Sequence, residues 1–182
     1  MNTDFSHIPA TEGVYKVTKG EGERFDVAGA RFTWKVKGDK TAYAFSVYEQ
    51  TLDPEEGVPP HSHACAEVFY LLEGAVDFLR IMDGKKDWVR CESGETLIVP
   101  PNALHAFFNK TSAPSRLLSI STHLHQAFFD EVARIDLAES FSTIPLPEAM
   151  GRVAEIASRY HMHFVPPDGT KVLNRTVKSL LD

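Results

Sequence analysis

The chain has 182 residues, 43% of them hydrophobic, and a formal net charge of −6. This length and composition fit one soluble globular domain with a sizeable core and argue against a second independent domain. The acidic balance, together with the lack of any cluster of Lys and Arg, argues against a nucleic-acid partner.

The sequence carries no recognisable membrane or export signal. It contains no apolar stretch of about 18 or more residues. Its first residues, MNTDFSHIPA, include neither a basic segment nor an apolar one. We therefore expect a cytoplasmic protein without a membrane partner. The two cysteines, Cys65 and Cys91, form no CxxC pattern, so we expect reduced thiols and no disulfide.

Short runs with a β pattern, separated by turn residues, fill most of the chain up to residue 122. The Asp83-Gly84 dipeptide favours a tight hairpin turn, and the three prolines within residues 53–60 indicate an ordered loop. No helical pattern lies between the strands, which predicts an antiparallel sandwich or barrel. The clearest predicted strands cover residues 31–36, 42–52, 75–82, 85–91, 96–99 and 116–122.

The pattern changes after residue 123. Apolar residues recur at helical spacing over residues 126–139 and again over 147–160, which predicts two amphipathic helices. Residues 164–182 are weakly patterned, and we expect a tail with a short final helix there. We accordingly divide the chain into a β-barrel with an N-terminal arm, residues 1–125, and a helical extension packed on the same domain, residues 126–182.

The stretch GVPPHSHACAEVFYLLEG, residues 57–74, sets His61, His63 and Glu67 at even spacing along a run with the pattern of a strand. Side chains in a strand alternate between its two faces, so these three project to one side. Two imidazoles and a carboxylate can converge there. We expect the chemistry of the protein on that face.

Two segments resemble the paired motifs of the cupin superfamily. In the first, HSH is followed by three residues, Glu67, six more residues and Gly74. The second contains, in the order of the family, Gly94, Pro100, Asn102, His105 and Asn109. The stretch between the motifs, residues 75–93, is short, as in microbial single-domain cupins.

The sequence departs from the cupin pattern at two positions. Gly57 is closer to His61 than the pattern has it, and Asn102 stands where the pattern has glycine. Asn tolerates left-handed backbone conformations better than most residues, so we expect the turn at Asn102 to be kept.

The resemblance implies a mainly β fold, a double-stranded β-helix or jelly-roll barrel, followed by C-terminal α-helices. It also implies one divalent metal, whose ligands would be His61, His63, Glu67 and His105. The residue types agree with this, because three neutral imidazoles and one carboxylate suit Fe, Mn, Ni, Co, Cu or Zn. Such a set leaves coordination positions open for water, dioxygen or a chelating substrate.

The segment SRLLSISTHLHQAFFDEVARI is similar to the last strand and following helix of cupins like quercetin 2,3-dioxygenase, although THLH replaces the usual proline and glycine. The resemblance implies a dioxygenase acting on an aromatic or enolic small molecule. Two alternatives stay open: an oxygen-independent isomerase, cyclase or lyase that uses the same metal, and a barrel that binds a small molecule without turnover. Exposed barrel edges favour a homodimer.

Several residues near the predicted site have two interpretations. Glu67 is either a plain ligand or a ligand that also accepts a proton from the substrate. Cys65 has the same parity as Glu67, and a buried core thiol is favoured over a thiolate ligand. Five apolar residues of matching parity either line a substrate pocket or fill the barrel interior. They are Phe45, Val47, Phe69, Leu71 and Phe107.

The remaining H-x-H pairs, His123 with His125 and His161 with His163, have no partnering Glu and no second motif. We expect them at the surface or at helix ends, and we expect no second metal site. Asn109 ends the second motif and is expected to make hydrogen bonds at a strand end.

Overall fold

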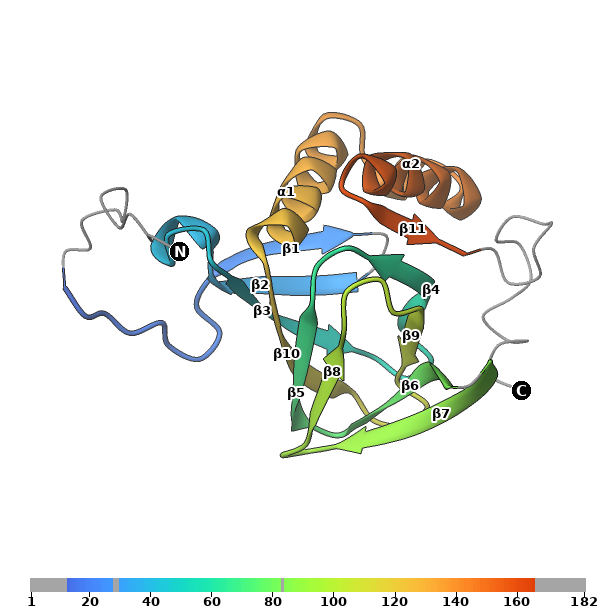
Figure 1. The fold of residues 1–182 in the computed structure, drawn as a ribbon. Helices are drawn as coiled ribbons and strands as arrows, with labels where there is room; N and C mark the ends of the chain where they lie inside the picture. The colour runs from blue at the N-terminus through green and yellow to red at the C-terminus, as the bar shows by residue number, and fades with distance from the viewer. Residues whose placement is uncertain (1–12, 28–29, 83, 166–182) are drawn as a thin grey trace, which may run out of the picture.

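The computed structural model describes residues 13–27, 30–82 and 84–165, which form two antiparallel β-sheets and a pair of helices (Figure 1). The larger sheet contains, in spatial order, β1 (Glu23–Val27), β2 (Ala30–Val36), β3 (Ser46–Leu52), β10 (Ser115–Ser121), β5 (Glu67–Glu73) and β8 (Thr96–Val99). The smaller sheet contains β11 (Met162–Phe164), β4 (Gly57–His63), β9 (His105–Phe108), β6 (Ala75–Met82) and β7 (Lys85–Glu92).

The two sheets enclose an apolar core. Strand β5 alternates buried and more exposed residues, so that Phe69 and Leu71 point inward. The rings of Phe69, Phe78 and Phe107 lie 5.1 to 5.4 Å apart in this core. Its buried members are Leu52, Phe69, Leu71, Val76, Phe78, Cys91, Val99, Phe107 and Leu117. Three of the five apolar residues proposed from parity therefore fill the barrel interior.

The other two residues of that set do not point inward. Phe45 precedes β3 and is 44% exposed, and Val47 lies on the half-buried alternate face of the strand. The predicted inward position of these two side chains is wrong. In β3 the buried face carries the even-numbered residues Ser46, Tyr48, Gln50 and Leu52, and a shift of one residue in the phase of a strand exchanges its two faces.

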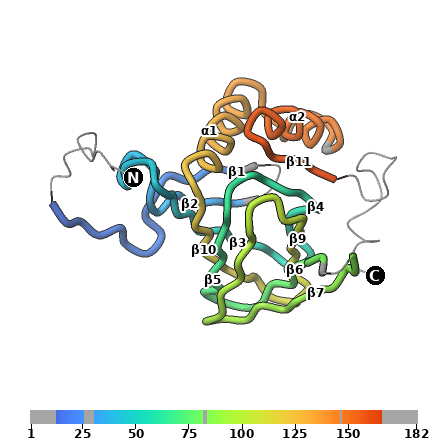
Figure 2. Tube along the Cα trace, in the orientation of Figure 1, coloured from blue at the N-terminus to red at the C-terminus, as the bar shows by residue number. Residues whose placement is uncertain are grey.

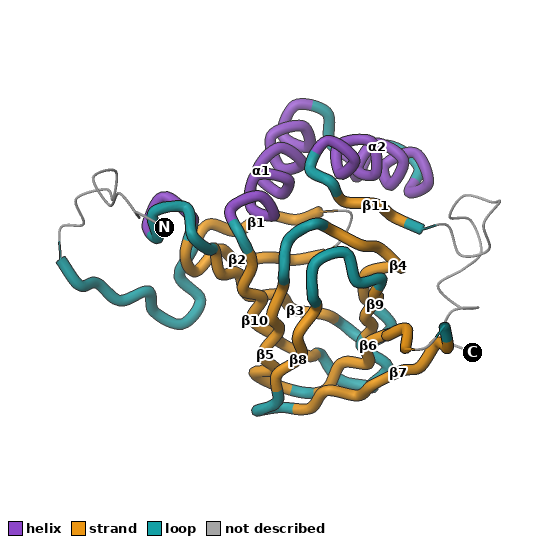
Figure 3. The backbone as a smooth tube through the Cα atoms, in the orientation of Figure 1, coloured by secondary structure: helices purple, strands orange, loops and turns teal. Residues whose placement is uncertain are grey.

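Two helices follow the last barrel strand, as the sequence predicts. They are α1 (His123–Ala138) and α2 (Leu146–Arg159), and Figures 2 and 3 show them together on one side of the molecule, beside β1, β2 and β11. The chain then returns to the barrel, because β11 pairs with β4. The second apolar core joins α1, α2 and β11 to the inner faces of β2 and β3. It includes Phe32, Trp34, Tyr48, Phe128, Phe129, Val132, Val153, Ile156 and Met162.

Some predictions concern residues at the ends of the chain. The expected short final helix falls largely on residues 166–182, which lie outside the described residues. In the described ranges, none of the helices has the length and apolar character needed to cross a membrane. Cys65 and Cys91 are both free and buried, as expected.

Candidate metal centre

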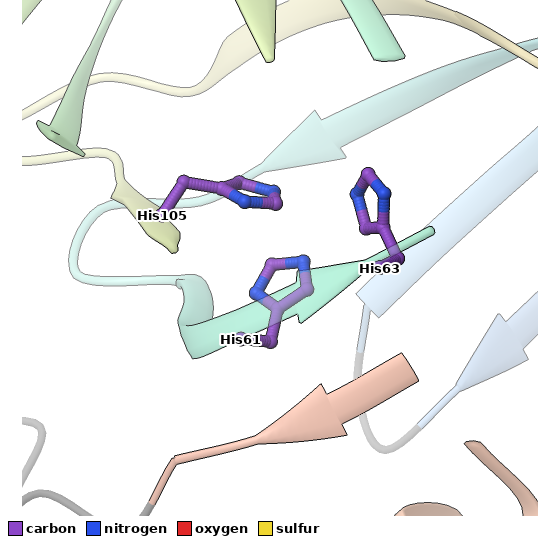
Figure 4. A group of neighbouring side chains, drawn as sticks. All are labelled: His61, His63 and His105. Atoms are coloured by element: carbon purple, nitrogen blue, oxygen red, sulfur yellow. The ribbon is translucent and has the colours of Figure 1, made fainter. Parts of the chain in front are cut away.

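Strand β4 places two histidines beside a third one from β9. The pairing of β4 with β9 shifts register between Val58 and His61, around Pro59 and Pro60, and His61 then pairs directly with His105. Proline within a sheet is tolerated at such irregularities because it cannot donate to the ladder. Figure 4 shows the three imidazoles, with His61 and His63 from β4 and His105 from β9, pointing toward a common centre.

Glu67 reaches this centre from the opposite sheet. The stretch read as one strand is in fact two: β4 ends at His63 in the smaller sheet, and β5 begins at Glu67 in the larger one. The single-strand interpretation of residues 57–74 is therefore wrong. His61 and His63 do share a face of β4, but Glu67 joins them because the two sheets face each other and not because of its parity in the same strand.

A backbone carbonyl two residues away orients each of the three histidine rings. The Nδ1 atoms of His61, His63 and His105 lie 2.8, 2.7 and 3.0 Å from the carbonyl oxygens of Pro59, Cys65 and Ala103, in each case two residues away. A ring that donates from Nδ1 presents Nε2 to the centre. This is the arrangement by which proteins fix the tautomer and direction of metal-binding imidazoles.

The nitrogen atoms of the three rings are close enough to share one ion. Ligand atoms of His61, His63 and His105 all lie within 4.8 Å of one another, and the three side chains are buried. Nε2 of His105 has no hydrogen-bond partner within the described part of the chain. Buried polar atoms normally have a hydrogen-bond partner, so this unpaired nitrogen is available to bind a metal ion at the centre.

Glu67 completes the set with one carboxylate oxygen. Its Oε2 lies 3.2 Å from His63 Nε2 and 4.0 Å from His105 Nε2. Two ligands bound at right angles to an ion at about 2.1 Å are about 3.0 Å apart, which is close to the first of these distances. The donor types therefore suit a divalent transition metal, and the spacing brings Glu67 within reach of an ion that His63 and His105 would share with His61.

The second oxygen of Glu67 is held by residues outside both motifs. Tyr48 donates its hydroxyl to Oε1 at 2.9 Å, and the Ser119 hydroxyl also donates to Oε1. His125 Nδ1 lies 3.7 Å from the same oxygen. Glu67 is only 1% exposed, so these contacts decide the position of the whole carboxylate.

The electrostatics of the cluster keep Glu67 ionised. Burial by itself would raise the pKa of the Glu67 carboxyl, but the nearby imidazoles of His125 and His63 and the Ser119 hydroxyl lower the pKa below its usual range. Burial is also the largest influence on His61 and His105, and it lowers the pKa of both, which keeps these rings neutral and able to bind a metal.

His63 differs from the other two rings because both of its nitrogens face an acceptor. Burial would lower its pKa, but the hydrogen bonds to Cys65 and Glu67 outweigh this and raise the pKa to about 10. A metal ion at the centre must therefore displace a proton from His63 Nε2.

The histidine outside the motifs that lies nearest this cluster is His125. It is the third residue of α1 and is 3% exposed, so of the two expected alternatives the helix end holds and the surface does not. Its ring stacks on Phe129 with centroids 4.9 Å apart. Burial lowers the pKa of His125 to about 4, so the ring is neutral. His161 and His163 are exposed, as expected.

Aromatic rings also contact the cluster from the helical side. Phe164 of β11 stacks against His61 with centroids 5.6 Å apart.

The Cys65 thiol lies 3.5 Å from His63 Nδ1 and is 6% exposed, in agreement with a buried thiol. Asn109 makes its expected hydrogen bonds at a strand end, donating to the carbonyls of Leu52 and Ala113.

Residues 48–121 match the family model described as the cupin domain. This range contains both motifs and all four candidate ligands. Together with the two facing antiparallel sheets, the match confirms the predicted fold class, a jelly-roll cupin barrel followed by helices. The chain thus carries a cupin domain with a histidine-rich site that can hold a metal ion.

Among curated proteins, acireductone dioxygenase from Saccharomyces cerevisiae is 44% identical over 55 residues. The match covers 29% of this chain and 31% of that protein, so it spans about a third of the length of the relative.

Two solved structures share the fold at 20% identity. The polyketide cyclase RemF from Streptomyces resistomycificus has a TM-score of 0.52, with 61% of this chain and 80% of that chain covered. A predicted oxalate decarboxylase from Thermotoga maritima has a TM-score of 0.51, with 59% and 98% covered. At this identity the likeness shows the fold alone.

Proposed function

We propose that this protein is a metal-dependent dioxygenase, similar to quercetinase-like cupins, that acts on an aromatic or enolic small molecule. The observation that carries the proposal is a buried cluster in a cupin barrel, in which three imidazoles lie close enough to share one ion and Glu67 Oε2 lies beside two of them, His63 and His105. The similarity to acireductone dioxygenase supports the choice of a dioxygenase.

In this proposal His61, His63, His105 and Glu67 hold one divalent ion, chosen from Fe, Mn, Ni, Co, Cu and Zn. When bound, such an ion supplies Lewis acidity and, if it is redox-active, electron transfer. The hydrogen bonds from each Nδ1 to a backbone carbonyl hold the three rings in place. The ligand set is thus preorganised by the fold.

Glu67 is the residue that takes a proton from the substrate in this proposal. Oε1 accepts hydrogen bonds from Tyr48 and Ser119, and Oε2 faces the ion in the ligand arrangement above, so Glu67 would have to leave the ion before Oε2 received the proton. Enols and phenols are more acidic than aliphatic alcohols, so a carboxylate base deprotonates them more readily.

The surroundings of the cluster favour an apolar substrate. The rings of Phe164 and Phe129 lie against His61 and His125, and the ligand side chains are 1% to 4% exposed. In this proposal a flat substrate that reaches the ion lies beside the partly buried ring of Phe164, which already stacks on His61.

The test is oxygen consumption by metal-loaded protein presented with a panel of flavonols and related enolic compounds. We expect turnover that depends on the metal and disappears after its removal by a chelator. No turnover across the panel at full metal occupancy would contradict the proposal. Turnover that continues without oxygen would instead assign the protein to the isomerases, cyclases or lyases, and tight retention of a compound without turnover would indicate a binding protein.

A further inference from the structure

His125 is a buried imidazole that neither cupin motif supplies. It comes from the first turn of α1, and its Nδ1 lies 3.7 Å from Glu67 Oε1. Within the described residues this Nδ1 has no hydrogen-bond partner. A buried nitrogen without a partner, directed at a carboxylate, is the kind of atom that an ion would satisfy.

The ring of His125 is held firmly in this position. It stacks on Phe129 with an interplanar angle of 24°, and Tyr48 meets it edge-on. Its centroid lies 5.0 Å from that of His63. Packing on these sides leaves the ring little freedom, so the contact with Glu67 is a property of the folded core and not of a mobile side chain.

We propose that His125, Glu67 and His63 form a second coordination position for the same divalent ion, with α1 supplying a ligand from outside the motifs. Ligand atoms of these three buried residues all lie within 4.8 Å of one another. Two imidazoles and a carboxylate suit zinc or cobalt as well as the redox-active ions of the first row. This inference rests on the metal centre proposed above.

The two positions are mutually exclusive. His63 belongs to both groups, but its Nδ1 donates to the carbonyl of Cys65, so only Nε2, once it has lost its proton, can bind an ion. One ion per chain is therefore expected. The ion can exchange His61 and His105 for His125 while it keeps Glu67 and His63.

The test measures Zn²⁺ binding by calorimetry in two variants. The double variant His61→Ala, His105→Ala removes two ligands of the motif site and leaves His63, Glu67 and His125 in place. We expect it to bind one Zn²⁺ per chain more weakly than the wild type. Addition of His125→Ala should weaken the remaining binding by at least about 10-fold, the lower end of what the loss of a residue orienting a metal ligand costs.

His123→Ala in the same double-variant background is the matched control. His123 lies in the same turn of α1 and also has an unpaired Nδ1, but its ring packs on Tyr43 and it belongs to neither ligand group. We expect this control to bind Zn²⁺ as the double variant does. If the variant with His125→Ala binds Zn²⁺ as tightly as the control, the second position does not exist.

A spectroscopic measurement covers the case in which the double variant does not fold. The single variant His61→Ala, alone and combined with His125→Ala or with His123→Ala, is loaded with Co²⁺, whose absorption bands report its ligands. We expect the combination with His125→Ala alone to change the bands of the single variant, and unchanged bands there would overturn the inference. Failure of the wild type to bind any metal would overturn the proposed function as well, whereas metal binding that is indifferent to His125 overturns only this inference.

Discussion

The two oxygens of Glu67 face two differently built halves of the site. Oε2 faces His63 and His105, which come from the cupin motifs. Oε1 faces three residues from β3, β10 and α1, none of which belongs to a motif; they are Tyr48, Ser119 and His125. One carboxylate therefore joins the part of the site that the two cupin motifs supply to a part made of residues outside the motifs.

The difference between the halves lies in how each is assembled. The motif half is built from short-range features, because each imidazole is oriented by a carbonyl two residues away. The other half depends on side chains that are distant in sequence. Tyr48 and Ser119 meet through the pairing of β3 with β10, and His125 joins them when α1 packs on the larger sheet. We expect changes on the Oε2 side to abolish metal binding and changes on the Oε1 side to tune it.

Replacement of the carboxylate itself should have the largest effect. Glu67→Gln removes the anionic ligand, and we expect metal affinity to fall by more than the roughly 10- to 100-fold that is typical of outer residues. Calorimetry with Zn²⁺ measures this. The matched control is Glu73→Gln, at the exposed end of the same strand, which should bind Zn²⁺ as the wild type does. Equal affinities in the two variants would remove Glu67 from the ligand set.

Loss of one hydroxyl on the Oε1 side should have an intermediate effect. Tyr48→Phe removes a donor to Oε1, so we expect metal affinity to fall by about 10-fold. Stability of the metal-free protein should fall by about 1 kcal/mol, measured by urea unfolding. Tyr70→Phe, on the exposed face of β5, serves as the control. A loss as large as that of Glu67→Gln would show that the two halves of the site are not distinct.

A smaller effect is expected from the ring that covers His61. Phe164→Ala removes a stacked aromatic neighbour, and such pairs contribute about 0.5–1.5 kcal/mol. If the protein loses this free energy only in the metal-bound state, its affinity for the metal falls by about 2- to 10-fold. Phe164→Tyr keeps the stacked ring and should preserve the affinity. An unchanged affinity in Phe164→Ala would show that His61 is held by the Pro59 carbonyl alone.

The smallest effect concerns the turn in the second motif. Asn102 has a φ of 64°, and its backbone N–H donates to the His63 carbonyl at 2.7 Å. Asn102→Ala should cost about 1 kcal/mol of stability, because alanine tolerates this conformation less well. Asn102→Gly, which restores the family pattern, should be at least as stable as the wild type. Equal thermal midpoints for Ala and Gly at this position would contradict the argument.

The motif half could be predicted from the sequence because its signals are local. His61, His63 and His105 each lie in a strand, as the cupin pattern predicts. The left-handed conformation expected at Asn102 is present. Even here the reasoning from parity failed for Glu67, because a turn between His63 and Glu67 moves the chain from one sheet to the other.

The other half could not be predicted in the same way. The phase of β3 is ambiguous in the sequence, since apolar residues occur on both of its faces, and only the pairing of Tyr48 with Ser119 resolves it. The position of His125 could have been predicted, but the predicted helix began at residue 126 and so did not include it. Together with Phe129 and Val132 it follows the helical spacing of the buried stripe, so a start at His123 would have placed it on the inner face.

The central claim is that the buried imidazoles and Glu67 bind one metal ion, and His63 is the residue that both ligand groups require. The most direct measurement is the metal content of protein purified without added metal, for the wild type and for His63→Ala side by side. We predict close to one transition-metal ion per chain in the wild type and almost none in the variant. A folded His63→Ala protein that retains the full metal content of the wild type would contradict the site assignment.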